Sequence, residues 1–191
     1  MITHLGTSLR ITIVSVILLG LIYPLVMTAL AQVIFPWQAK GSPVTVDGRT
    51  VGSASVGQLW RKPQYFHGRP SAAGKGYDPT ATGGTNFGPT SKKLIDSTRA
   101  TIAALEKENP DASGSPPMDL ITSSGSGIDP DITPEAAYWQ APRVAKARQI
   151  SLSAVRALVG RHVRGRTFGF LGEPRVNVLE LNLALDGLKP D

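Results

Sequence analysis

The longest apolar run of the chain covers residues 11–35, and the sequence carries no charged residue between Arg10 and Lys40. As a helix, such a run spans about 37 Å, which is enough to cross a hydrocarbon layer of about 30 Å. A lipid environment also tolerates the proline at position 24. Phe35 and Trp37 fall where aromatic side chains are common at membrane interfaces. The pattern therefore predicts a transmembrane helix over residues 11–35.

A cleaved signal peptide is the alternative interpretation of this run. Ala29-Leu30-Ala31 before Gln32 is similar to a cleavage site. The apolar stretch before it, residues 11–28, is longer than the usual core of about 7–15 residues, and apolar residues continue to Phe35. A retained anchor is favoured. Cleavage after Ala31 would instead release a periplasmic domain that binds or hydrolyses a small molecule.

Charge alone leaves the orientation of the span nearly undecided, but long domains cross membranes largely regardless of their charge. We therefore expect a cytoplasmic head over residues 1–10 and an extracytoplasmic domain over residues 36–191.

Small or helix-bending residues recur at multiples of four within the span, namely Thr12, Gly20, Pro24 and Thr28. Small residues let another helix approach closely in lipid. The stripe is either a packing face for a partner helix or the ordinary use of Gly and Pro in membrane helices.

The first half of the remaining chain predicts a hairpin, a loop and a helix. Asp47-Gly48 between β-branched residues predicts a hairpin over residues 45–51 with a type I′ turn, and an extended stretch is expected near residues 58–60. Residues 67–90 are rich in Gly and Pro, lack apolar periodicity and predict a long loop, a kind of segment that is often functional. A helix should follow from Ser91 to about Asn109. Its apolar side is formed by Leu94, Ile95, Ile102 and Leu105.

The second half predicts mixed elements. Residues 118–122 favour a strand, and Thr133-Pro134 marks a helix start. Pro142 should interrupt that helix before a second helical stretch to about residue 163, with Ser151 as a cap. Leucines at every second position predict a final strand over residues 176–185, although Leu and Ala also fit a helix. Strands and helices in mixed order predict a small α+β domain.

Composition narrows the classes of function. The absence of cysteine excludes disulfides and a thiol nucleophile. The net charge is +6, but Lys and Arg do not cluster with aromatic residues, so nucleic-acid binding is not predicted.

No catalytic motif is complete. Gly68 and Gly74 are separated by five residues rather than four, and Gly76 stands where a P-loop needs Ser or Thr after Lys75. Ser126 has glycine one residue away on either side, whereas a nucleophile elbow needs two. Asp129, Asp131 and Glu135 form an acidic cluster that could attract cations, but turns at the two aspartates and a helix N-terminus at Glu135 are the favoured explanation. The residues predict a non-catalytic domain without a metal site.

Four long stretches carry a resemblance to a known family. They are YFHGRPSAAGKGYDP, TGGTNFGPTSKKL, DLITSSGSGIDPDITPEAAYWQAPRVAKAR and FGFLGEPRVNVLELNLALD. With the single span, they make nearly the whole chain similar to the C subunit of the Kdp-type potassium-transporting P-type ATPase of bacteria.

The resemblance implies an accessory subunit in the bacterial inner membrane. Its partners would be a channel-like potassium-binding subunit, an ATP-hydrolysing P-type subunit and a very small single-span subunit. The external domain would lie over the potassium entrance, and the subunit would act as a catalytic chaperone that raises the ATP affinity of the hydrolysing subunit. ATP and potassium would be handled by the partners rather than bound here.

The chaperone role raises the question of nucleotide contact. Residues 82–86 (Thr82, Gly83, Gly84, Thr85 and Asn86) weakly resemble the signature loop of ABC ATPases, but the predicted topology puts them across the membrane from ATP. An indirect effect is expected instead, through preferential binding to one conformation of the pump. The predicted partner contacts in and beside the loop are Tyr65, Phe66, Arg69, Asn86 and Phe87, because aromatic residues and Arg are common interface anchors.

Overall fold

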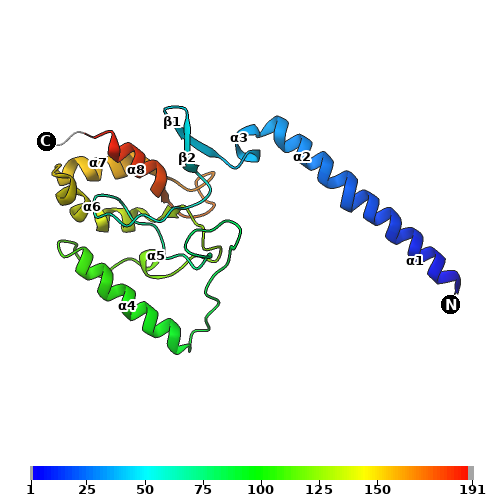
Figure 1. Ribbon diagram of the computed structural model, residues 1–191, viewed down its shortest axis with the longest axis horizontal. Helices are drawn as coiled ribbons and strands as arrows, with labels where there is room; N and C mark the ends of the chain where they lie inside the picture. Colours follow the sequence, from blue (N-terminus) through cyan, green and yellow to red (C-terminus); the bar gives the residue numbers. More distant parts are fainter. Residues whose placement is uncertain (1, 189–191) are drawn as a thin grey trace. The chain divides into compact units, whose positions relative to one another are not determined.

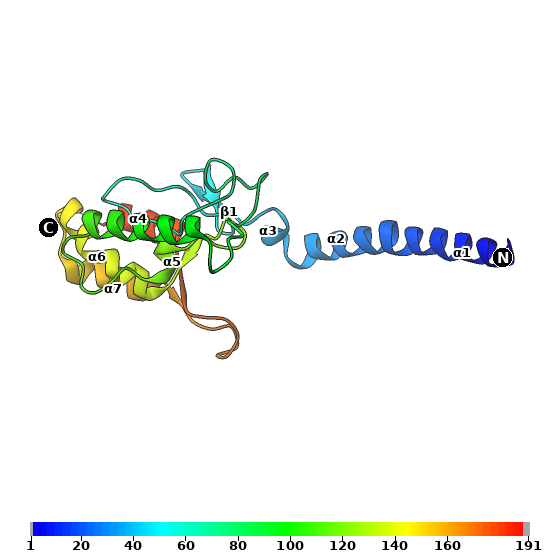
Figure 2. The same ribbon diagram turned by 90° about the horizontal axis from the view of Figure 1, so that it is seen from below.

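The computed structural model describes residues 2–188 (Figures 1 and 2). They divide into two compact units, with the boundary between Val51 and Gly52. The first unit begins with three consecutive helical segments, α1 (Ile2–Ser15), the π-helical η1 (Val16–Ile22) and α2 (Tyr23–Ile34). Residues His4–Ile34 form one apolar helix of 31 residues with a mean hydropathy of 2.4, and none of its most apolar stretch is buried within the chain. The predicted long apolar helix is confirmed, and it extends further towards the N-terminus than residue 11.

The π-helical segment lies directly before Pro24. Proline has no N–H to offer the preceding turn, and its ring clashes with the carbonyl group four residues earlier. The Tyr23 N–H donates to the Leu18 carbonyl, five residues back, which is the π-helical spacing. The wider turn before the proline accommodates it without ending the helix.

The predicted hairpin is also present. After the short helix α3 (Pro36–Ala39), β1 (Pro43–Val46) pairs with β2 (Arg49–Ser53). Asp47 and Gly48 have φ values of 49° and 74°, both positive as a type I′ turn requires. The expected extended stretch at residues 58–60 is not a strand. The chain there instead follows a loop, and the Gly57 N–H donates to the Ile128 carbonyl at 2.9 Å.

The second unit is a small α+β domain. Its elements are α4 (Lys92–Glu108), α5 (Met118–Ile121), β3 (Asp131–Ile132), α6 (Pro134–Arg148), α7 (Leu152–His162), β4 (Val163–Arg164), β5 (Arg175–Asn177) and α8 (Val178–Asp186). The three short strands form an antiparallel sheet in the order β3-β5-β4, in which Val176 pairs with both Ile132 and Val163. The predicted α+β class is confirmed.

Helices α6, α7 and α8 enclose most of the core. Four alanines of α6 are buried and let neighbouring elements approach closely: Ala136, Ala137, Ala141 and Ala145. They meet Val155, Val159, Leu181 and Leu185 from α7 and α8, and Phe66 fills the same core from the loop region. Of the helix predicted from residue 91, confirmed as α4, only Leu105 packs against this core.

Two predicted strands are helices. Residues 118–121 form α5, because Pro117 precedes it and Asp119 lies in its first turn, where a negative charge is favourable. Residues 178–186 form α8 rather than a strand. The Asn177 side chain accepts the Glu180 N–H at 3.1 Å and starts this helix, a cap that the alternating leucines concealed.

The boundary between α6 and α7 also differs from the prediction. Pro142 lies inside α6 and does not interrupt it. The helix ends at Arg148, and Gln149 follows it in a left-handed conformation with φ 56°. Ser151 caps α7 as predicted, by accepting the Ala154 N–H at 3.2 Å.

Candidate functional site

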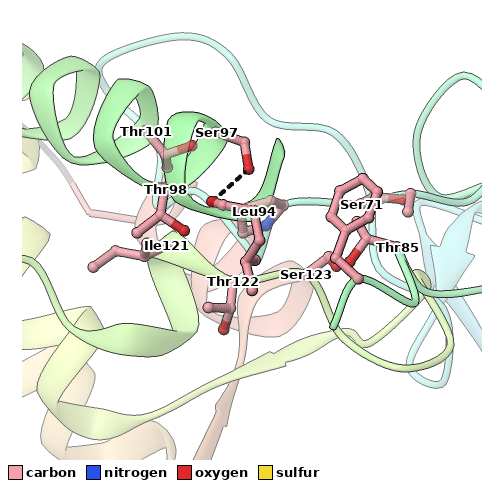
Figure 3. A pocket seen from close by; sticks show the side chains of 12 residues that line it. Ser71, Thr85, Leu94, Ser97, Thr98, Thr101, Ile121, Thr122 and Ser123 are labelled. Carbon is pink, nitrogen blue, oxygen red and sulfur yellow. Dashed lines mark hydrogen bonds between the residues drawn. The ribbon is translucent and has the colours of Figure 1, made fainter. Parts of the chain in front are cut away.

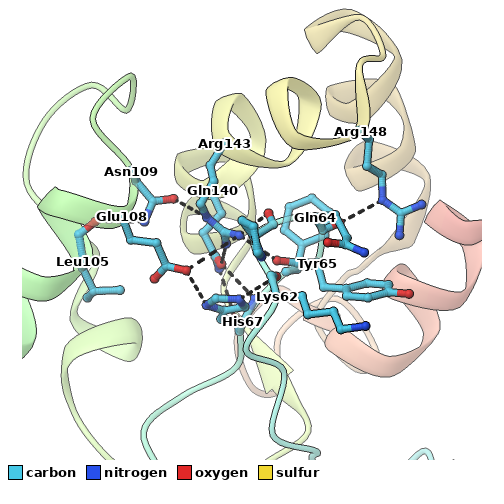
Figure 4. A network of polar contacts seen from close by, with 12 residues as sticks. Lys62, Gln64, Tyr65, His67, Leu105, Glu108, Asn109, Gln140, Arg143 and Arg148 are labelled. Atoms are coloured by element: carbon cyan, nitrogen blue, oxygen red, sulfur yellow. Dashed lines mark hydrogen bonds and ion pairs between the residues drawn. The ribbon is translucent and has the colours of Figure 1, made fainter. Parts of the chain in front are cut away.

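The loop of residues 67–90 is confirmed as a segment without helix or strand, all of it within the described part of the chain. Its position is fixed at the start by the segment 63–67, whose backbone is held by side chains rather than by a sheet (Figure 4). The Asn182 amide accepts the Phe66 N–H at 2.8 Å and donates to the Phe66 carbonyl at 3.0 Å. The Gln140 amide does the same for His67, at 2.9 and 3.1 Å. Each side-chain amide therefore makes the two hydrogen bonds that a residue of a neighbouring strand would otherwise make.

Arg143 completes this support. Its buried guanidinium group donates to the carbonyls of Pro63 and Tyr65, to the Asn109 side chain at 2.8 Å and to the Gln140 side chain at 2.8 Å. Burial lowers the pKa of Arg143, and the neighbouring Glu108 carboxylate raises it only in part. The charge is satisfied by fixed oxygen atoms, so Arg143 acts as a structural cation. We name Gln140, Arg143 and Asn182 the backbone clamp.

His67 lies against the clamp. Its ring nitrogens face the Glu108 carboxylate at 3.3 Å and the Lys62 carbonyl at 3.1 Å (Figure 4). Burial, and then the positive charge of Arg143, lower the pKa of His67 below its ordinary value, although Glu108 opposes the shift. The ring is therefore held neutral by its surroundings and serves the packing of this segment.

Two of the five predicted contact residues are occupied inside the domain. Phe66 is completely buried in the core, which removes its side chain from any surface contact and corrects the prediction. The Tyr65 ring is half-buried, lies 4.7 Å from the Trp60 ring and carries the Arg148 guanidinium 4.9 Å above it. Its hydroxyl donates to Asp186 at 3.3 Å.

Arg69 holds the loop to the segment that precedes β3. Its guanidinium group pairs with the Asp129 carboxylate at 3.1 Å and donates to the Ser123 carbonyl at 3.4 Å. Asp129 also accepts the Asp131 N–H at 3.1 Å, as expected of a turn residue. The side chain of Arg69 is thus engaged within the domain.

A serine and a tyrosine fix the first part of the loop. The Ser71 hydroxyl donates to the Gly127 carbonyl at 2.5 Å and accepts the Tyr77 N–H at 2.7 Å. The Tyr77 hydroxyl donates to the Arg69 carbonyl at 2.5 Å. Burial, and to a lesser degree Asp129, raise the pKa of Tyr77 to about 12, so it remains a donor.

Glycines let the loop approach the segment 123–127 closely. The Gly83 N–H donates to the Ser126 carbonyl at 2.8 Å. A Cβ atom on Gly127, which has φ 72°, would lie 2.6 Å from the Gly83 carbonyl oxygen, so no other residue fits there without movement. Ser126, the serine compared with a nucleophile elbow in the sequence, therefore contributes its carbonyl group to a contact between two backbone segments.

The weak nucleotide candidates lie on this part of the loop. Thr82, Thr85 and Asn86 are exposed, whereas Gly84 lies against the segment 123–127 and Gly83 contacts it through its backbone. Because the Gly83 N–H is already donated to Ser126, the stretch is poorly suited to bind a phosphate through successive backbone N–H groups.

A pocket of about 180 Å³ lies between the loop, α4 and the end of α5 (Figure 3). Seven of its lining residues carry hydroxyl groups: Ser71, Thr85, Ser97, Thr98, Thr101, Thr122 and Ser123. Its apolar wall includes Phe87, which is 40% exposed, and Leu94. None of the twelve described residues that line it is charged, so the pocket suits a neutral surface better than an ion.

The structure thus brings Arg69 and the loop base together and leaves Asn86 and Phe87 exposed at the rim. Sequence reasoning missed the clamp residues, together with Ser71 and Tyr77. A usable signal was present for Asn182, because it is an uncharged polar residue among the leucines of its helix, and a buried amide needs a partner.

Comparison with known proteins extends over both units. The family model described as "KdpC: K+-transporting ATPase, c chain" matches residues 5–187. The chain is 52% identical to the potassium-transporting ATPase KdpC subunit of Koribacter versatilis, covering 98% of this chain and 96% of that protein. It is 55% identical to the corresponding subunit of Myxococcus xanthus, over 94% and 86%, and 50% identical to that of Caulobacter vibrioides, over 100% and 96%.

The clamp generates a stability prediction. Replacing Asn182 by Ala leaves the buried Phe66 N–H and carbonyl without partners, so we expect the free energy of unfolding to fall by about 2–4 kcal/mol. Urea unfolding of the detergent-solubilised chain, followed by tryptophan fluorescence, measures this. As a control, Lys146→Ala removes an exposed ion pair of 2.8 Å and should cost less than about 1 kcal/mol. Equal losses for both variants would contradict the role of the clamp.

His67 generates a pH prediction. Because its pKa is lowered in the folded state, its contribution to stability is complete above the unfolded pKa of about 6.5 and is lost as the pH falls towards the folded value. In His67→Gln the fall in stability below pH 6.5 should be shallower than in the wild type. Urea unfolding of both proteins across a pH series tests this, and parallel slopes for the variant and the wild type would refute it.

Proposed function

The chain belongs to the KdpC family, the c chains of K+-transporting ATPases, and we propose that it is the non-catalytic accessory subunit of an ATP-driven, high-affinity potassium import complex. One observation carries the proposal: the match runs from residue 5 to residue 187 and so includes both the apolar helix and the domain. The proposed partners are a channel-like potassium-binding subunit, an ATP-hydrolysing P-type subunit and a small single-span subunit.

We propose that the apolar helix is retained as a single-pass anchor in the bacterial inner membrane. A helix of 31 residues is about 46 Å long, which exceeds the hydrocarbon thickness and leaves room for tilt. In this arrangement residues 1–10 are cytoplasmic, residues 11–35 lie in the lipid bilayer and residues 36–191 are extracytoplasmic. Helix α2 continues through Ala31 to Ile34, which supports retention over cleavage after Ala31.

The small-residue stripe is proposed to pack against a partner helix. Four residues of an α-helix turn through about 400°, so a four-residue repeat drifts sideways by about 40° at each step. A π-helix has more residues per turn, and the same step there comes closer to one full turn. Because η1 contains Gly20, the wider helical turn reduces the sideways drift of the repeat at that point, which supports the proposal. Thr12 and Gly20 line one shallow groove on the helix surface.

The external domain is proposed to sit near the potassium entrance, with the rim of the loop as a partner contact. Asn86 and Phe87 are the exposed contact residues, while Arg69 and Tyr65 support the loop from behind. The neutral, hydroxyl-lined pocket beside Phe87 can accept a partner side chain without the cost of burying a charge.

The effect on ATP affinity is proposed to be indirect. A domain that binds one conformation of the pump more tightly than another shifts the affinity for every other ligand by linkage. Residues 82–86 stay weak candidates for direct nucleotide contact, because the proposed topology separates them from ATP.

Gentle detergent extraction tests the assignment. An affinity-tagged chain should be recovered with its N-terminus intact and with a P-type ATPase in stoichiometric amount. Phe87→Ala should reduce that recovery severalfold while the chain stays in the membrane fraction, whereas Ile95→Ala, an exposed apolar change on α4, should not. A mature chain beginning at Gln32, found in the soluble fraction, would support the released periplasmic domain instead.

The stripe is tested separately. Gly20→Leu places a bulky side chain on the proposed packing face and should lower recovery of the complex without preventing insertion. Ala29→Leu is the matched control, because it enlarges a small residue one position beyond the stripe. Recovery that falls equally in both variants would remove the stripe as a specific contact.

A further inference from the structure

The connection between β4 and β5 ends in an exposed apolar tip. The ten residues 165–174 leave the sheet at the Arg164–Arg175 pair, and Figure 2 shows this orange segment extending away from the helices of the domain. Phe168 is 85% exposed, Phe170 69% and Leu171 50%. We define these three residues as the apolar tip. They lie outside every contact that the proposed function uses.

The tip has a defined shape. Thr167 and Leu171 exchange two backbone hydrogen bonds of 2.9 Å, and the Phe170 N–H donates to the Thr167 carbonyl at 3.3 Å. The turn between them requires Phe168 to adopt φ 54° and Gly169 to adopt φ 82°. The three large side chains are therefore presented by a closed turn rather than by an open coil.

Phe168 has an unfavourable backbone conformation in this turn. A left-handed conformation is rare for a bulky residue and costs free energy that Asn or Gly would largely avoid. Because the ring is exposed, packing inside the domain offsets little of this unfavourable free energy. The hydrogen bonds of the turn hold Phe168 in this conformation, and residues held in such conformations cluster at functional sites.

The sequence around the tip is basic. Residues 161–175 contain four arginines and one glutamate, a net charge of +3 for this stretch. Three of these arginines also pair with carboxylates of the domain: Arg166 with Glu173 at 2.6 Å, Arg175 with Asp131 at 3.1 Å, and Arg164 with Glu180. Arginines at the base of an aromatic loop can reach headgroup phosphates while their aliphatic stems cover apolar surface.

The connection between the apolar helix and the domain is short. Residues 35–51 separate the end of α2 from the domain, and a chain of 17 residues spans at most about 60 Å even when fully extended. A surface that is tethered so closely meets the membrane at high effective concentration.

The size of the tip further favours lipid. A stable protein interface needs about 800 Å² on each partner, so a protein that bound the three side chains of the tip would have to contact other parts of the domain as well. Insertion to a depth of about 5–10 Å at the boundary of headgroups and acyl chains suits a feature of this kind.

We propose that the apolar tip is a second membrane contact, which inserts Phe168, Phe170 and Leu171 into the surface of a bilayer containing anionic lipid. The proposal rests on the membrane anchoring of the N-terminal helix. It gives the domain a preferred orientation on the membrane, because the anchor and the tip then hold it at two points.

Because the sequence has no cysteine, single-cysteine reporters test the proposal directly. The full-length chain carries an environment-sensitive fluorophore at Leu171→Cys, at Leu19→Cys in the apolar helix, or at Ile95→Cys on α4. Each protein is reconstituted alone into phosphatidylcholine vesicles with or without phosphatidylglycerol, and quenching by aqueous iodide is measured.

We expect the reporter at 171 to lose most of its iodide quenching and to shift its emission to shorter wavelength, more strongly with phosphatidylglycerol present. The reporter at 95 should stay quenched. Phe168→Asn, which fits the left-handed turn but removes the ring, should restore quenching at 171 while leaving the fold intact. Unchanged shielding in that variant would overturn the proposal.

The other outcomes are also decisive. A quenched reporter at 171 together with a shielded reporter at 19 overturns the tip contact and leaves the anchor standing. A quenched reporter at 19 refutes the anchor itself. Shielding at 171 that disappears on dilution of protein in lipid indicates a second copy of the chain, and shielding that requires the co-reconstituted pump subunits indicates a protein partner. Both results would overturn insertion into lipid.

Discussion

The placement of the candidate site depends on how the backbone of residues 63–67 is paired. Buried N–H and carbonyl groups must find partners, and this segment has no neighbouring strand to supply them. The Gln140 and Asn182 side chains each hydrogen-bond both the N–H and the carbonyl of one residue. Arg143 donates to two further carbonyls. Once the segment is fixed, Phe66 fills the core and the following loop starts from a defined point. The short strands of the domain would give little order to this region by themselves.

The elements that could be predicted from sequence are those specified by local chemistry. Asp47-Gly48 specifies its turn, Ser91 and Ser151 mark helix starts, and the apolar run specifies a long helix. The errors arose where two local signals competed. Alternating leucines over residues 176–185 imitate a strand, but the Asn177 cap decides for α8. Likewise, proline disfavours the interior of a helix, yet α6 continues through Pro142. The packing of α6 against α7 outweighs the low helix propensity of this single residue.

The candidate site was located only in part for a related reason. Composition identified the loop of residues 67–90, and the exposed Asn86 and Phe87 remain suitable contacts. Phe66 could not be distinguished from its exposed neighbours, because burial depends on Asn182, more than a hundred residues away in the sequence. Arg69 looked like an interface anchor, whereas its partner Asp129 looked like a turn residue, and only the structure joins them. Pairing across such distances leaves no local trace in a single sequence.

The backbone clamp also has a consequence for the order of folding. Its contacts close chain separations of 73 and 116 residues, and closures of this length are slow relative to the formation of helices. Asn182 belongs to the last helix of the domain, so the segment that precedes the loop can dock only after the ribosome has released nearly the whole polypeptide. Until then Phe66 and the faces of α6 and α7 stay open to solvent. Incomplete cores of this kind expose apolar surface that is prone to aggregation, so the late closure of the clamp sets the period during which the nascent domain is most vulnerable.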